Sequence, residues 1–219
     1  DNIGASLFAS AVAEDQPTID VLNALDLAAS AVGNHEFDRG YADLVDRVVA
    51  GGTNSQWPYL GANVYEKGTE NPALDEYTVL DVQGVRVGVV GAVTQETPTL
   101  VTPGGIETLD FGDPVEAVNR VAAQLSDGDE SNGEADVIVA EYHEGAGAGT
   151  PDGATLEEEI AAGGAFADIA TATSADVDVI FTGHTHKQYA WYGPAEPGAT
   201  GEGTRPIVQT GSYGENIGK

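Results

Sequence analysis

The chain has 219 residues, and its 36 Asp and Glu against eight Lys and Arg give a formal net charge of −28. Nucleic acid polymers and anionic membranes bind basic surfaces, so this charge argues against both as partners. Cysteine is absent, which excludes disulfides, thiolate nucleophiles and thiolate metal ligands. No run of about 18 apolar residues occurs, so we expect no membrane insertion.

The first part of the chain predicts helices that alternate with short strands. Residues 17–27 have apolar positions at helical spacing and Pro17 at their start, which predicts a helix. A second helix is predicted over residues 41–50, and apolar runs over 29–32 and 59–64 predict strands.

In the middle of the chain, turn and cap residues predict a hairpin and a helix start. Two β-branched runs about Gln83 and Gly84 predict a hairpin over residues 77–93. Residues 113–125 predict a helix that begins at Asp113 as the N-cap, with Pro114 in its first turn.

The last part continues the alternation of strands and helices. Strands are predicted over residues 135–143, 175–186 and 206–214, and a helix weakened by two glycines over residues 156–172. Stretches of small and polar residues predict loops over residues 126–136, 145–155 and 193–204. The sequence therefore predicts one α/β layered domain over residues 1–219.

All four histidines lie at carboxyl ends of predicted strands: His35, His143, His184 and His186. Ligands bind at this edge of α/β sheets, although a single histidine there is more often a capping or half-buried residue. Imidazole suits Zn, Mn, Fe, Co or Ni, and carboxylate or amide oxygens suit Mn, Mg or Fe. The four together predict a metal site.

The segments GNHEFD (residues 33–38) and GHTH (183–186) refine this hypothesis. A turn at Gly183 allows two imidazoles to serve two neighbouring ions, which clamp the oxygens of a phosphate ester when about 4 Å apart. Asn34 is then a further ligand, and we expect Gly33 to let the backbone turn tightly behind it.

These motifs, with the lone His143 and the closing QTGSYGENIGK, resemble the calcineurin-like metallophosphoesterases. They resemble more narrowly the secreted 5'-nucleotidase/UDP-sugar hydrolase branch. The resemblance implies a sandwich of two mixed β-sheets flanked by helices. It also implies a nucleotide or nucleotide-sugar substrate, and a bacterial protein that is secreted or associated with the cell surface or cell wall.

The resemblance also implies roles for individual residues. Asp1 is similar to the carboxylate that bridges two divalent ions, which could be Zn, Mn, Fe, Co or Mg. Asn34, His143 and His184 resemble ligands of one ion, and His186 a ligand of the other. His35 and Asp38 resemble the catalytic pair, in which Asp38 orients the imidazole.

Two departures from the family pattern leave alternatives open. The family has an Asp-x-His strand before the bridging carboxylate and a C-terminal domain that stacks the base, and this sequence shows neither. We therefore expect a fragment or processed form with an incomplete metal site. A 2',3'-cyclic nucleotide phosphodiesterase or another phosphoesterase is an alternative. An inactive fragment that only binds metal or phosphate is another.

Other acidic and aromatic residues are expected to be structural. Glu36, Glu141 and Glu144 are interpreted as supporting or surface residues. Residues 127–136 resemble a calcium loop only in composition. Trp191 and Tyr192 are interpreted as core or surface packing residues, with substrate stacking as the alternative.

Overall fold

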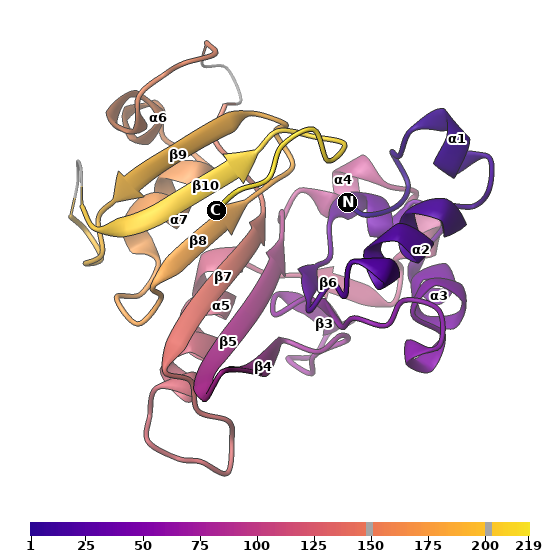
Figure 1. The fold of residues 1–219 in the computed structure, drawn as a ribbon, viewed down its shortest axis with the longest axis horizontal. Coiled ribbons are helices and arrows are strands. Elements are labelled where there is room, and N and C mark those ends of the chain that lie inside the picture. The colour runs from indigo at the N-terminus through magenta and orange to yellow at the C-terminus, as the bar shows by residue number, and fades with distance from the viewer. Residues whose placement is uncertain (148–150, 200–202) are drawn as a thin grey trace.

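The computed structural model describes residues 1–147, 151–199 and 203–219, and a six-stranded mixed sheet forms its centre (Figure 1). The strand order is β4-β5-β7-β8-β10-β9. Strands β5, β7, β8 and β10 are parallel, and β4 and β9 are antiparallel edges. The bounds are β4 Tyr77–Val82, β5 Val85–Val93, β7 Val137–His143, β8 Val179–Thr182, β9 Gln188–Gly193 and β10 Arg205–Thr210. The parallel core brings the ends of β7 and β8 to one edge.

Three helices follow the sheet strands: α5 (Pro114–Leu125), α6 (Leu156–Ala162) and α7 (Ala165–Ala172). In Figure 1, α5 and α7 lie behind the sheet. The apolar side of α5 packs on β7, where Val118 and Val121 join Ile138 in the main buried cluster. Asp113 caps α5 as predicted, because its carboxylate accepts the N–H groups of Val115 and Glu116.

Small sheets and helices cover part of the opposite face of the large sheet. β1 (Ser30–Ala31) pairs in parallel with β2 (Tyr59–Leu60), and Leu60 packs against Val89 of β5. β3 (Val64–Glu66) pairs with β6 (Leu109–Phe111). The remaining α-helices are α1 (Phe8–Ala11), α2 (Gln16–Ala24), α3 (Tyr41–Asp43) and α4 (Thr97–Leu100). The predicted α/β fold, with mixed sheet and flanking helices, is confirmed.

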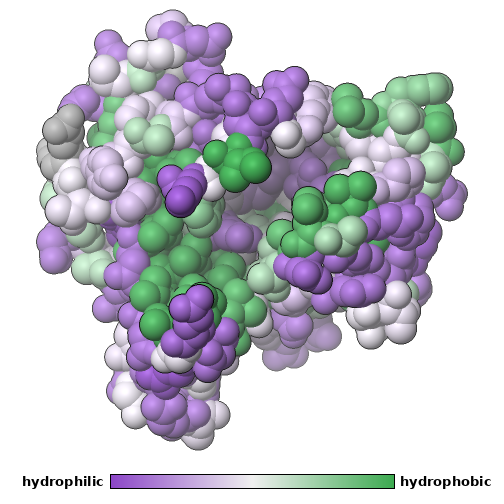
Figure 2. Space-filling model, in the orientation of Figure 1, coloured by the Kyte–Doolittle hydropathy of each residue, from purple (hydrophilic) through white to green (hydrophobic). Residues whose placement is uncertain are grey.

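Part of the front face of the large sheet remains apolar and open to solvent. Figure 2 shows hydrophobic side chains gathered there over β5, β7 and β8. Val85 is 43% exposed and Phe181 37% exposed. None of the helices in the described part of the chain combines the length and apolar character that spanning a membrane requires.

Most predicted elements are confirmed, with differences at their ends. The hairpin turns at Gln83 and Gly84, and the last strand forms β10. The strand predicted over 59–64 ends at Leu60, and the one over 175–186 is only β8.

The predicted helices differ more from what the structure shows. Residues 156–172 form two helices, because Gly163 and Gly164 adopt positive φ angles of 75° and 84°. The segment 41–50 is helical, but its second part, Leu44–Val49, is a π-helix.

The prediction missed the edge strand β9. The packing interpretation of Trp191 is confirmed, because its ring stacks on Tyr189 at 4.0 Å within β9. Of the predicted loops, residues 148–150 and 200–202 lie outside the described residues.

Candidate metal centre and catalytic pair

The GNHEFD segment follows β1 and brings two polar side chains to different sides of one tight turn. Residues Asn34–Phe37 form a 3-10 helix in which Asn34 is 3% exposed, whereas the His35 side chain is partly exposed. Gly33 is extended, with φ −102°, so a positive φ does not require glycine there. A Cβ atom at Gly33 would collide with Asp1 Oδ1 and lie 2.8 Å from Cε1 of His143. The glycine is therefore required by close approach rather than by the tight turn that we expected.

Three predicted ligands converge on His143 at the end of β7. Its Nε2 lies 3.0 Å from Oδ2 of Asp1 and 3.0 Å from Oδ1 of Asn34. The His184 ring packs edge-on with its centroid 5.0 Å from that of His143. One donor atom each from Asp1, His143 and His184 lie within 4.8 Å of one another. The structure therefore brings together residues that are distant in the sequence.

The chemistry of this cluster fits a bound cation. Burial lowers the pKa of His143 well below its usual value, and burial also lowers the pKa of His184. Both rings are therefore neutral at pH 7, which is the form that coordinates metals. A neutral imidazole can donate one Nε2 hydrogen, yet two acceptor oxygens face that atom. A divalent ion accommodates two oxygens and two imidazoles without this conflict.

The GHTH turn follows β8 and places its two histidines differently. His184 and His186 both have positive φ angles, 68° and 61°. His184 joins the cluster, whereas His186 lies beside Tyr213, with ring centroids 6.1 Å apart. In the described part of the chain, His186 shares no ligand group with Asp1 and His143. Its predicted role as a ligand of a second ion stays a prediction.

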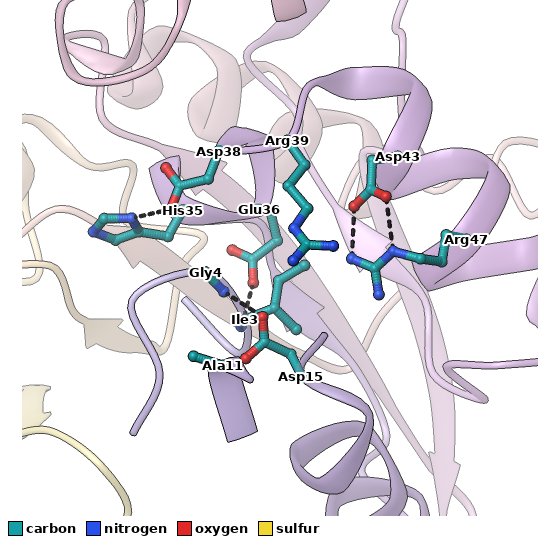
Figure 3. Close-up of a pocket in the computed structure, with 10 residues that line it drawn as sticks. All are labelled: Ile3, Gly4, Ala11, Asp15, His35, Glu36, Asp38, Arg39, Asp43 and Arg47. Carbon is teal, nitrogen blue, oxygen red and sulfur yellow. Dashed lines mark hydrogen bonds and ion pairs between the residues drawn. The ribbon is translucent and has the colours of Figure 1, made fainter. Parts of the chain in front are cut away.

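The predicted catalytic pair is close enough to interact directly. Nδ1 of His35 lies 2.8 Å from Oδ2 of Asp38. The backbone N–H of His35 donates to Asp1 Oδ1 at 3.1 Å, so the pair adjoins the cluster. A pocket of about 180 Å³ lies behind the pair, and it is lined partly by Ile3, Arg39 and Arg47 (Figure 3).

Three buried or half-buried side chains support the site. The expected supporting roles of Glu36 and Glu141 are confirmed, whereas the sequence analysis missed Gln209. Glu36 accepts backbone N–H groups from two separate segments. The carboxylate of Glu141 in β7 accepts the N–H of Ala31 in β1 at 2.8 Å, and this hydrogen bond links the two strands. Gln209 of β10 donates to Oγ1 of Thr185 within the GHTH turn at 2.8 Å. Glu141 lies two residues before His143 on β7, and residues two apart on a strand share a face.

Comparison with known proteins finds matches in both sequence and fold. The family model for calcineurin-like phosphoesterases matches residues 7–188. The chain is also similar to the calcineurin-like phosphoesterase YfkN of Bacillus subtilis, whose crystal structure superposes with a TM-score of 0.62. That likeness has 27% identity and covers 90% of this chain and 57% of the other.

Three relatives share moderate identity with the whole or most of the chain. Endonuclease YhcR of Bacillus subtilis is 31% identical over 100% of this chain and 17% of its own length. Cell wall protein Lmo0130 of Listeria monocytogenes is 31% identical over 85% of this chain and 26% of its own length. A 5'-nucleotidase of Vibrio cholerae is 26% identical over 97% of this chain and 36% of its own length. The chain thus spans about a third or less of each relative.

Proposed function

This chain belongs to the calcineurin-like phosphoesterase family, and we propose that it is the catalytic domain of a metal-dependent 5'-nucleotidase or nucleotide-sugar hydrolase. The observation that carries the proposal is the convergence of Asp1, Asn34, His143 and His184 beside the His35–Asp38 pair. The similarity to a 5'-nucleotidase supports the substrate class. The similarity to a cell wall protein supports secretion or attachment to the cell surface.

The proposed ligands divide between two ions. Asp1, Asn34, His143 and His184 would hold the first ion, and Asp1 and His186 would contribute to the second. Divalent ions bound there supply Lewis acidity for the phosphoryl oxygens and lower the pKa of water, which makes it a nucleophile. Their identity is left to experiment, since this donor set suits Zn, Mn, Fe and Co.

His35 and Asp38 act on the substrate rather than on the metal in this proposal. Because Nδ1 of His35 faces Asp38 at 2.8 Å, its Nε2 is the ring nitrogen left for the substrate. A protonated ring there stabilises negative charge on the phosphoryl oxygens or gives a proton to the leaving oxygen. Asp38 fixes the orientation of the ring.

The decisive experiment measures two reactions of the full-length protein: release of phosphate from AMP, and release of UMP and glucose 1-phosphate from UDP-glucose. The protein is first treated with EDTA and then given Mn²⁺, Zn²⁺ or Co²⁺ separately. We expect activity to vanish with the chelator and to return with at least one ion. The His143→Ala variant is the control, because it should not recover at the same metal concentration.

A second candidate function is phosphodiester hydrolysis, which the identity to a protein named an endonuclease favours. Bis(p-nitrophenyl) phosphate and 2',3'-cyclic AMP distinguish the two candidates. Turnover of these diesters without release of phosphate from AMP would replace the nucleotidase proposal. Metal binding without turnover of any of these substrates would instead indicate a binding module.

A further inference from the structure

Glu36 is one of the most deeply buried charged residues described, and its carboxylate is occupied by backbone groups. The residue is 1% exposed. Oε1 accepts the N–H of Asn2 at 2.7 Å and that of Ile3 at 3.2 Å, and Oε2 accepts the N–H of Gly33 at 2.5 Å. Figure 3 shows the carboxylate directed at Ile3, between the N-terminal segment and the turn that carries His35.

The two segments that Glu36 joins both carry groups of the site. Residues 1–5 lie in none of the described helices or strands, and the N–H groups of Asn2 and Ile3 donate to Glu36 and that of Gly4 to Asp15. The segments are in close contact, because a Cβ atom at Gly4 would lie 2.6 Å from the carbonyl oxygen of His35. The Glu36 carboxylate therefore links the segment that carries Asp1 to the turn that carries Asn34 and His35, beside the direct bond from the His35 N–H to Asp1.

We infer that Glu36 is a positioning residue that sets the affinity of the metal centre by holding the Asp1 segment against the Gly33–His35 turn. This inference rests on the proposed function, because it takes the Asp1 cluster to be a metal centre. Glu36 is not itself a ligand, since both of its oxygens face backbone N–H groups and it does not share the ligand group of Asp1, His143 and His184.

The replacement Glu36→Gln tests this inference. The replacement keeps the size of the side chain but puts an amide NH₂ group in place of one carboxylate oxygen. An NH₂ group cannot accept a hydrogen bond, so either the N-terminal segment or Gly33 loses the acceptor of its backbone N–H. A matched control is Asp178→Asn. The Asp178 carboxylate accepts the N–H of Ile138 at 2.8 Å, near the beginning of β7 and so at the opposite end from His143.

Two measurements on the full-length protein separate positioning from general stability. The first is the Kd for Mn²⁺ by calorimetry, together with the EPR spectrum of the bound ion. We expect Glu36→Gln to raise this Kd by ~10–100-fold, as is usual for groups that orient metal ligands, and to change the spectrum. The second is hydrogen exchange in the metal-free protein. We expect faster exchange at residues 1–5 and 31–36 in Glu36→Gln, and Asp178→Asn to leave both measurements unchanged.

Each other outcome has a definite meaning. An unchanged Kd in folded Glu36→Gln would overturn the inference, even if exchange is faster. If that variant does not fold, Glu36→Asp replaces it, with a smaller increase in Kd expected and an unchanged Kd again overturning the inference. Wild-type protein that binds Mn²⁺ but hydrolyses no phosphoester would overturn only the proposed function. Wild-type protein that binds none of Mn²⁺, Zn²⁺ and Co²⁺ would overturn both.

Discussion

Asn34 and His35 are adjacent in the chain, yet they face different environments in one turn. The Asn34 side chain is buried and its Oδ1 lies 3.0 Å from Nε2 of His143. The His35 ring is partly exposed and pairs with Asp38 at 2.8 Å. The turn thus separates a proposed metal ligand from a proposed group that contacts substrate.

Replacing His35 should therefore reduce turnover without removing metal. We expect His35→Ala to lower kcat by at least about 10²-fold, which is typical for loss of a positioned acid or base. Asp38→Asn should also lower kcat, but by a smaller factor, because the His35 ring remains. Steady-state kinetics on AMP and metal analysis of the same samples provide the measurement.

The outcome that would contradict these roles is equally specific. If His35→Ala loses metal, and excess metal restores its activity, then His35 is a ligand rather than a group that contacts substrate. The matched comparison is His143→Ala, for which loss of metal is the expected result.

Adding one methyl group at Gly33 should disturb the metal centre. Gly33→Ala places a Cβ atom against Asp1 and 2.8 Å from Cε1 of His143, so one of these side chains must move. We expect the Kd for Mn²⁺ to rise by about 10-fold or more, by analogy with other changes that misorient ligands. Gly104→Ala is the control, because no atom lies within 4 Å of its Cβ position. Equal affinity in both variants would show that the centre tolerates the shift.

Arg205 should contribute strongly to stability although it lies outside the site. Its buried guanidinium donates to the carbonyl oxygens of Thr173 and Ser174, which follow the end of α7, at 3.1 and 2.7 Å. We expect Arg205→Ala to lower the free energy of unfolding by about 3 kcal/mol, because buried carbonyls lose a charged donor. Urea unfolding measures this loss. Arg86→Ala, which removes an exposed ion pair with Asp136, should change stability little.

Tyr189 should make the fold sensitive to alkali. Burial raises the pKa of Tyr189 to about 12 from its usual 10.0. The unfolded chain therefore loses this proton first, and the folded state loses stability as the pH rises between these two values. Tyr189→Phe should be less stable near neutral pH, because Thr182 and the N–H of Ala146 lose a partner. Its unfolding free energy should fall less steeply above pH 10.0, as urea titrations at several pH values would show.

The sequence by itself determined the elements that local patterns encode. The hairpin at Gln83 and Gly84 and the capped helix α5 depend on turn and cap residues that act within a few positions. The placement of all four histidines near strand ends also followed from the chain, because each lies at or shortly after the end of an apolar run.

Only the tertiary structure decided which of these side chains meet. His143 contacts Asn34 although the two residues are 109 positions apart in the chain. Strand β9 forms by antiparallel pairing with β10. The role of Glu36 likewise depends on a segment more than 30 residues away. Such contacts are set by sheet order and by the close approach of glycines such as Gly33, and neither leaves a periodic signal in the sequence.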